Sequence, residues 1–152
     1  MRKPIYIKTN RLINQPIEKV WSEVALGFGN VANYNPEIKA SKFETDQKEG
    51  IGTQRHCDTK DGGYLKERII AWESQKFFKL ELVSSSYPMS LIESKFSFER
   101  HDSQTMVVQE FWYRMKPPMG WLSGLMKGKM TKTLNSGLEG LENYMLNNEK
   151  EN

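Results

Sequence analysis

The sequence predicts an α+β domain in which a curved antiparallel sheet of about seven strands wraps around one long C-terminal helix. Three observations predict this fold. Successive segments after residue 37 alternate polar and apolar residues, as strands with one buried face do. One strand-like and two helix-like segments precede them, and a single long segment of helical period follows. Because short turns join the later strands, the sheet is antiparallel, and the long helix is left to cover its apolar face.

The first part of the chain predicts a strand followed by two short helices. Residues 4–13 alternate roughly and predict a strand. After a proline at an early helical position, apolar residues at helical spacing predict a helix with one buried face: Ile17, Val20, Trp21 and Val24. The stretch "GFGN" ends this helix. Asn30 is a candidate N-cap for a second short helix at residues 31–35, which Pro36 ends.

The remaining elements follow from the change of period along the chain. The expected strands span residues 38–44, 53–59, 64–72, 76–84, 91–99 and 105–115. From Trp121 to about Asn147 the period becomes helical, with one apolar stripe: Leu122, Leu125, Met126, Met130, Leu134, Leu138, Leu141, Tyr144 and Met145. Residues 1–147 are therefore expected to form one domain, with a polar tail at residues 148–152.

Composition and charge exclude several classes of protein. The chain has 152 residues and a net charge of +3, which is too weakly basic to indicate nucleic-acid binding. No stretch is apolar enough to predict a transmembrane helix, and residues 1–10 lack the apolar run of a signal peptide. The single cysteine, Cys57, predicts no disulfide within the chain and favours a cytoplasmic location.

The stretch "YLKERII" places a carboxylate on the apolar face of a predicted strand. Alternation turns Leu65, Glu67 and Ile69 toward the inside of the sheet and Arg68 toward solvent. An unpaired charge is costly inside a protein. Glu67 therefore needs a partner of opposite charge, a function, or both.

The preceding strand offers that partner, because paired residues of a hairpin share a face. A three-residue loop ending in Gly62, with this glycine in the left-handed region, sets Arg55 directly opposite Glu67. A five-residue loop preserves the faces but sets Arg55 against Ile69 instead. The Arg55–Glu67 pair is either a buried salt bridge of the sheet or a polar anchor that orients a ligand in an apolar pocket.

The last strand has two faces that divide its polar residues. One face carries Met106, Val108, Glu110, Trp112 and Arg114, and the other carries Val107, Gln109, Phe111, Tyr113 and Met115. Periodicity alone favours the second face as the inner one, which would turn Glu110 toward solvent.

Several motifs together resemble one superfamily. The motifs "NQPIEKVWSEV", "NYNPEI", "GIGTQRHCDTKDGGYLKERI", "VVQEFWYRM" and "SGLEGLENYM" have an order and spacing that resemble the START-like (SRPBCC) superfamily, most closely its polyketide cyclase/dehydrase and lipid-transport branch. The resemblance spans nearly the whole chain. It implies a helix-grip fold with an internal cavity between sheet and C-terminal helix. It also implies binding of hydrophobic small molecules and, in some branches, cyclisation or dehydration.

The resemblance also bears on the last strand. In plant hormone receptors of this superfamily, glutamates at the places matching Glu67 and Glu110 face the cavity. The resemblance therefore implies that Glu110 points inward, against the periodicity of its strand. The gate motifs of those receptors have no match in this sequence, so a receptor role does not carry over.

The expected ligand-binding residues combine a polar anchor with an apolar lining: Arg55, Glu67 and Glu110 with Leu65, Ile69, Phe78, Leu80, Phe96, Phe98, Met130 and Leu134. The expected partner is a hydrophobic small molecule or lipid, with no cofactor, no metal site, no nucleic acid and no integral membrane association. One alternative is a cyclase or dehydratase in which Glu67 and Glu110 act as acid and base. A second alternative is a protein-interaction module whose cavity is filled, which methionine-rich packing allows.

Other notable residues have ordinary structural roles as well as functional ones. Cys57 is expected to be a small buried residue beside Leu65 rather than a nucleophile. Tyr34 and Tyr87 fall near expected loop ends, where their hydroxyls contact either a ligand or water. A solvated face is the ordinary role of the lysines near Trp121, and contact with an anionic membrane surface is the alternative.

Overall fold

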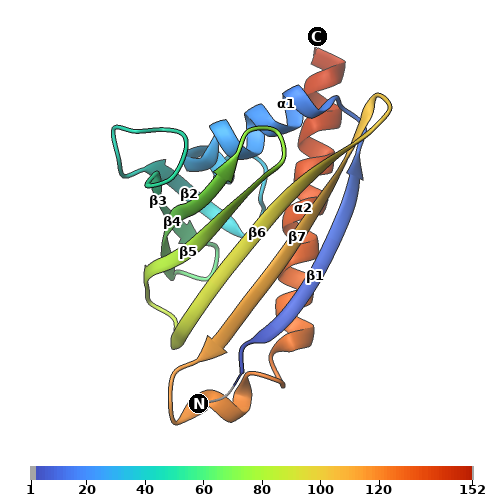
Figure 1. Cartoon of the computed structure of the whole chain (residues 1–152). Helices are drawn as coiled ribbons and strands as arrows, with labels where there is room; N and C mark the ends of the chain where they lie inside the picture. The colour runs from blue at the N-terminus through green and yellow to red at the C-terminus, as the bar shows by residue number, and fades with distance from the viewer. Residues whose placement is uncertain (1–2, 152) are drawn as a thin grey trace.

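A seven-stranded antiparallel sheet curls around the C-terminal helix, which confirms the predicted α+β helix-grip fold (Figure 1). The computed structural model describes residues 3–151, and it describes side chains as far as residue 147. The strands are β1 (Ile5–Ile13), β2 (Ile38–Phe43), β3 (Gln54–Thr59), β4 (Tyr64–Glu73), β5 (Phe77–Ser85), β6 (Met89–His101) and β7 (Gln104–Met115). The helices are α1 (Ile17–Trp21), the π-helical turn η1 (Ser22–Leu26), the 3₁₀ turns η2 (Phe28–Asn33) and η3 (Met119–Leu122), and α2 (Lys127–Glu151).

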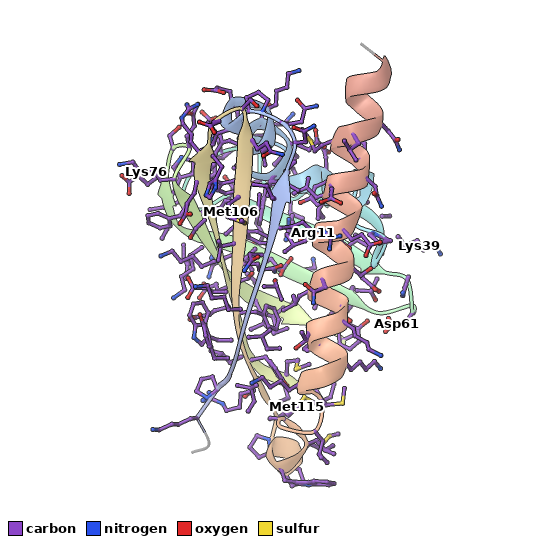
Figure 2. The ribbon with its side chains drawn as sticks, turned by 90° about the vertical axis from the view of Figure 1, so that its right-hand side faces the viewer. Arg11, Lys39, Asp61, Lys76, Met106 and Met115 are labelled. Atoms are coloured by element: carbon purple, nitrogen blue, oxygen red, sulfur yellow. The ribbon has the colours of Figure 1, made fainter. Side chains whose placement is uncertain are left out.

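The strand order β1-β7-β6-β5-β4-β3-β2 places the first strand beside the last. The strands from β2 to β7 pair in succession, as hairpin-connected strands do, and the short helices fill the connection between β1 and β2. The long helix α2 runs alongside β1 and crosses the inner face of the sheet (Figure 2). Within residues 3–151, no helix is both long and apolar enough to cross a bilayer.

The short helices differ in detail from the sequence prediction. The expected helix after Pro16 is divided into α1 and η1, and it buries the predicted face that includes Val20 and Val24. The second short helix begins earlier than expected, at Phe28, and no side-chain hydrogen bond caps it. Asn30 lies inside this turn with non-helical backbone angles, so the predicted N-cap at Asn30 is wrong.

The C-terminal helix also begins later and ends later than expected. The segment from Trp121 splits into η3 and, after a break at residues 123–126, the long helix α2. Glycines at positions 124 and 128 lower helix propensity across this break. The backbone of α2 continues to Glu151, so the helix extends into the stretch expected to be a polar tail, and Asn152 lies outside the described residues.

Two apolar clusters divide the space between the sheet and α2. The α1 cluster lies next to the short helices, and its buried members are Ile13, Ile17, Val20, Trp21, Val24, Ala25, Phe28, Ile69, Phe78, Leu80, Phe98, Val107, Leu138, Leu141 and Met145. The η3 cluster lies at the other end of α2, and its buried members are Ile7, Met89, Ile92, Phe111, Tyr113, Met115 and Leu134. Half-buried side chains surround the η3 cluster: Ile5, Leu65, Leu82, Tyr87, Met119, Met126 and Met130. The two clusters share one sheet and one helix but differ in how completely they are covered.

Candidate ligand-binding site

The β3–β4 hairpin has the register that the sequence predicts. Arg55 pairs with Glu67, and Cys57 pairs with Leu65. The loop between the strands contains Gly62 with a φ of +93°, the left-handed conformation that a three-residue hairpin loop requires. The register therefore brings Arg55 and Glu67 face to face on the inner surface of the sheet.

Arg55 and Glu67 form a buried ion pair. Nε of Arg55 donates to Oε1 of Glu67 at 3.0 Å, and the Nη2–Oε1 distance is 2.9 Å. Nη1 of Arg55 donates to the backbone oxygen of Phe28 at 3.0 Å, and the guanidinium carbon lies 4.0 Å from the centre of the Phe28 ring. Each charged side chain is only 9% exposed. Hydrogen bonds and a cation–π contact together hold the guanidinium in one orientation.

Burial and charge shift the pKa values of several groups around this pair. Burial opposes the charged form of Arg55, but the neighbouring Glu67 carboxylate raises the pKa of Arg55 above its ordinary value. Burial raises the pKa of the Cys57 thiol to about 12, so this thiol stays protonated and is a poor nucleophile. Burial also raises the pKa of Tyr34, whose hydroxyl feels the charge of Arg55. Arg55 thus stays charged inside the fold, while Cys57 and Tyr34 stay neutral.

Two oxygen atoms beside the ion pair keep hydrogen-bonding capacity. Every donor that reaches the Glu67 carboxylate, including the Cys57 thiol at 4.0 Å, approaches Oε1. Within residues 3–151, no side-chain or backbone donor bonds to Oε2, and the Tyr34 hydroxyl has no partner either. Oε2 of Glu67 and the Tyr34 hydroxyl are therefore both free to form a hydrogen bond with a ligand or with water.

Buried polar residues form a band across the inner face of the sheet, which leucines interrupt at β5. Arg55 and Glu67 lie on one side of β5 and Ser94, Gln109 and Thr9 on the other, because Glu67 pairs with Leu82 and Ser94 pairs with Leu80. Nε2 of Gln109 donates to Oγ of Ser94 at 3.0 Å, and Thr9 pairs with Gln109 in the β1–β7 ladder. The Thr9 hydroxyl is buried and has no hydrogen-bond partner among the described residues. A buried hydroxyl without a partner is costly, so the polar band contains a hydrogen-bonding group that the fold itself leaves unpaired.

The polar band marks the boundary between the two apolar clusters. In β6, Ser94 follows Ile92 of the η3 cluster and precedes Phe96, which packs against the α1 cluster. Glu67 has the same position in β4, between Leu65 of the η3 cluster and Ile69 of the α1 cluster. The η3 cluster therefore has polar groups along its inner edge and solvent at its outer one.

The expectation that Glu110 faces the interior is wrong. Glu110 lies on the outer face of β7, where it pairs in register with Lys8 and Lys95 and accepts a hydrogen bond of 2.7 Å from the Tyr6 hydroxyl. This hydrogen bond raises the pKa of Tyr6. The inner face is instead the one that periodicity favoured, because alternate residues of β7, Gln109 among them, are buried. Glu110 cannot act together with Glu67, since the sheet separates them.

The predicted apolar lining residues fall into two groups. Ile69, Phe78, Leu80 and Phe98 are fully buried members of the α1 cluster, and Phe96 packs against it. They are packed core residues, since the short helices and the end of α2 cover them. Leu65, Met130 and Leu134 belong to the η3 cluster or pack against it.

The sequence reasoning missed or misplaced several residues near the ion pair. Gln109, Ser94 and Thr9 lie on inner strand faces, and the alternation of their strands is the signal that places them there. Tyr34 lies just after η2, in a turn without periodicity, so no sequence pattern predicts that it approaches Arg55. Tyr87 lies in the turn between β5 and β6, near a strand end as expected, and packs against the η3 cluster, but its hydroxyl bonds to Thr59 at 2.6 Å and to Asp61.

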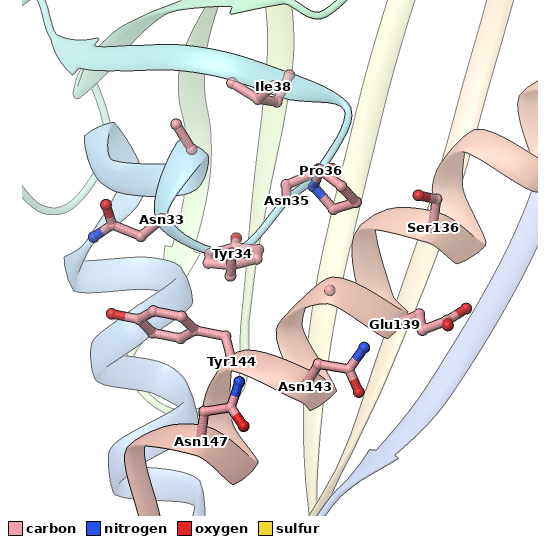
Figure 3. A pocket seen from close by; sticks show the side chains of 12 residues that line it. Asn33, Tyr34, Asn35, Pro36, Ile38, Ser136, Glu139, Asn143, Tyr144 and Asn147 are labelled. Carbon is pink, nitrogen blue, oxygen red and sulfur yellow. The ribbon is translucent and has the colours of Figure 1, made fainter. Parts of the chain in front are cut away.

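A groove lies between residues 32–38 and α2 (Figure 3). It is an open groove of about 490 Å³ with polar walls formed by Asn33, Asn35, Ser136, Glu139, Asn143 and Asn147. At Gly140 the missing side chain lets α2 approach the backbone of Tyr34. Tyr34 thus belongs both to this groove and to the surroundings of Arg55. Among the described side chains, no three His, Cys, Asp or Glu residues gather as metal ligands.

Comparison with protein families identifies the chain. A family model described as polyketide cyclase/dehydrase and lipid transport matches residues 5–146. The chain belongs to this family. As a member of the polyketide cyclase/dehydrase and lipid transport family, it places Glu67 on the inner face of its sheet but Glu110 on the outer face. A comparison with curated proteins finds no significant match.

Solved structures share the fold of this polyketide cyclase/dehydrase and lipid transport family member at low sequence identity. A protein from Thermus thermophilus is 19% identical, with a TM-score of 0.77 over 93% of this chain and 97% of that chain. A START superfamily protein from Mycobacterium smegmatis is 17% identical, with a TM-score of 0.74 over 91% of this chain and 97% of that chain. The protein XoxI from Bacillus cereus is 20% identical, with a TM-score of 0.73 over 95% of this chain and 97% of that chain. These likenesses establish the helix-grip fold.

Proposed function

We propose that the protein binds a hydrophobic small molecule or lipid with a polar end, held between the sheet and the first half of α2. One observation carries the proposal. The side chains around the η3 cluster are only half-buried, although they face the space between sheet and helix, and they adjoin a buried ion pair with an unused carboxylate oxygen. Apolar walls with a few convergent polar groups are typical of small-molecule sites.

The two ends of the site suit different parts of the ligand. Leu65, Leu82 and Met130 offer aliphatic and thioether surface, and methionine adapts its shape to irregular ligands. Oε2 of Glu67 accepts hydrogen bonds, so the polar end of the ligand should carry a donor such as a hydroxyl. Arg55 holds the carboxylate in one orientation, and a hydrogen bond to a member of an ion pair is stronger than one between neutral groups.

The alternative functions have weaker support. A cyclase or dehydratase that uses two interior carboxylates loses one of them, because Glu110 lies on the outer face. A protein-interaction module with a filled interior fits the α1 cluster, whose members are fully buried, but not the half-buried residues around the η3 cluster.

Two measurements test ligand binding. Native mass spectrometry of the purified protein should detect a co-purified apolar molecule. Titration with the neutral fluorescent probe N-phenyl-1-naphthylamine should give saturable binding, which Leu65→Trp should weaken about tenfold by filling the site. Met130→Trp should do the same from the helix side. Val83→Trp is the matched control, because Val83 lies on the outer face of β5 and is 41% exposed.

A matched pair of ligands tests the polar anchor. Decanol should displace the probe at about tenfold lower concentration than decyl methyl ether, because only the alcohol donates a hydrogen bond to a charged acceptor. The double variant Arg55→Met/Glu67→Leu should abolish this difference. Probe binding that all three tryptophan variants leave unchanged, with no co-purified molecule, would overturn the proposal.

A further inference from the structure

Two apolar side chains protrude from the segment between β7 and α2. Trp121 is 58% exposed and Leu125 is 73% exposed. Among the described residues, the other large exposed apolar side chains lie elsewhere in the chain, and only Ile51, at 63% in the β2–β3 loop, is as exposed as this pair. An exposed apolar pair on one short segment is the kind of feature that marks an interaction site rather than ordinary surface.

The fold holds this segment in place. Ser123 is buried between the two exposed residues; its Oγ accepts a hydrogen bond of 3.2 Å from the backbone of Met115, and its backbone oxygen accepts one from the Tyr113 hydroxyl. The backbone of η3 also bonds back to Lys116 at 2.8 Å. Trp121 and Leu125 therefore point outward from an anchored turn.

The segment around these two residues carries only positive charges. Every charged residue from position 111 to position 138 is basic: Arg114, Lys116, Lys127, Lys129 and Lys132. The four lysines are exposed. The rest of the chain contains more acidic than basic residues, so the positive net charge of the protein comes from this segment. We call the segment that carries Trp121, Leu125 and these four exposed lysines the basic tip.

We propose that the basic tip docks on an anionic lipid bilayer. Exposed Trp and Leu side chains insert at the boundary of headgroups and acyl chains, and lysines beside them pair with anionic headgroups. The tip lies at the end of the molecule opposite the C-terminus, where Met115 ends β7 and α2 begins (Figures 1 and 2). A flat membrane can approach this end without meeting α1 or the C-terminal half of α2.

The same segment also contributes to the candidate ligand site. Met119 and Met126 flank the exposed pair along the chain, and both pack against the η3 cluster. Docking would therefore bring the half-buried end of that cluster against the bilayer, from which an apolar ligand could transfer without crossing water. Docking does not depend on the proposed ligand binding. Only the role of docking in ligand transfer rests on the proposed function.

Vesicle sedimentation with the full chain tests the docking. The protein should sediment with vesicles of phosphatidylcholine and phosphatidylserine but not with vesicles of phosphatidylcholine alone, and added salt should weaken binding. Trp121→Ser/Leu125→Ser should lower the affinity about tenfold or more. Lys127→Gln/Lys129→Gln should lower it about tenfold or more on anionic vesicles.

Matched variants control for general effects. Ile51→Ser removes an equally exposed apolar residue from the β2–β3 loop, and Lys39→Gln/Lys42→Gln removes two lysines from β2; both should bind vesicles as the wild type does. Each tip variant should retain its circular dichroism spectrum and its binding of N-phenyl-1-naphthylamine, so a failure of docking is distinct from a failure of the ligand site. Equal binding to both kinds of vesicle, no loss in the tip variants, or tip-dependent binding to nucleic acid in place of vesicles would overturn the proposal.

Discussion

The α1 cluster and the η3 cluster occupy the same sheet and face the same helix, yet they are built from different side chains. In the α1 cluster, the Trp21 ring meets Trp72, Phe78 and Phe98 edge to face at centroid distances of 5.0, 6.2 and 5.1 Å. Around the η3 cluster, methionine and leucine side chains remain half-buried. Interlocked aromatic rings have preferred geometries, whereas thioethers adapt to many shapes.

The two clusters also differ in what covers them. The short helices α1 and η1 close the α1 cluster on the side that α2 does not reach. The η3 cluster has only the first half of α2 and the segment before it. One face of one sheet therefore provides a core at one end and a candidate binding site at the other.

The largest effect is expected from opening a cavity in the α1 cluster. Phe78→Ala should cost about 4 kcal/mol of the free energy of unfolding, because Phe78 is 1% exposed and its neighbours are rigid rings. Leu82→Ala, beside the η3 cluster, should cost about 1–2 kcal/mol, because this side chain is already half-exposed. Urea unfolding measures both values. Similar costs for the two variants would show that the clusters are equally packed.

The next effect tests the boundary between the clusters. Arg55→Met should cost about 3 kcal/mol, because it leaves the buried Glu67 carboxylate without its partner. The double variant Arg55→Met/Glu67→Leu should recover most of this stability, since apolar residues replace both charges. Urea unfolding of the single and double variants forms the test. A double variant as unstable as the single one would mean that the pair is needed for folding itself.

The smallest effect concerns the cover of the α1 cluster. Burial raises the pKa of Glu23 in η1 above its ordinary value of 4.5. The folded state therefore holds this proton more tightly than the unfolded state, so stability is lost as the pH rises above about 4.5. Glu23→Gln should match the wild type at and below about pH 4 and be more stable by a few tenths of a kcal/mol at pH 7, since partial exposure screens the charge. Thermal unfolding across this pH range gives the measurement, and a difference that is constant with pH would exclude titration of Glu23 as its cause.

The alternation of side chains predicts most of the fold and the ion pair. Strand period and Gly62 together suffice to place Arg55 opposite Glu67, because the register of a hairpin follows from its faces and its loop. The same period places Gln109 inward and Glu110 outward. At Glu110, local periodicity is the better guide to side-chain direction than the resemblance to the superfamily.

Other features depend on tertiary packing that no local pattern contains. Ile69 and Leu65 have the same inward phase in β4, but only Ile69 is fully covered, because the short helices pack over that end of the sheet. Tyr34 approaches Arg55 from a turn without periodicity. The sequence therefore predicts which side chains face inward but not which of them remain accessible.

The polar band across the sheet also sets a length. From Gln109 in the band, β7 continues to Met115 at the end of the η3 cluster. This is a rise of roughly 20 Å at about 3.3 Å per residue. For the ligand we propose, that rise is the length of the apolar strand face between the level of the polar band and the segment that carries the basic tip. A longer chain must emerge beside Trp121, so the distance between the polar band and the basic tip would limit the length of ligand that the site encloses.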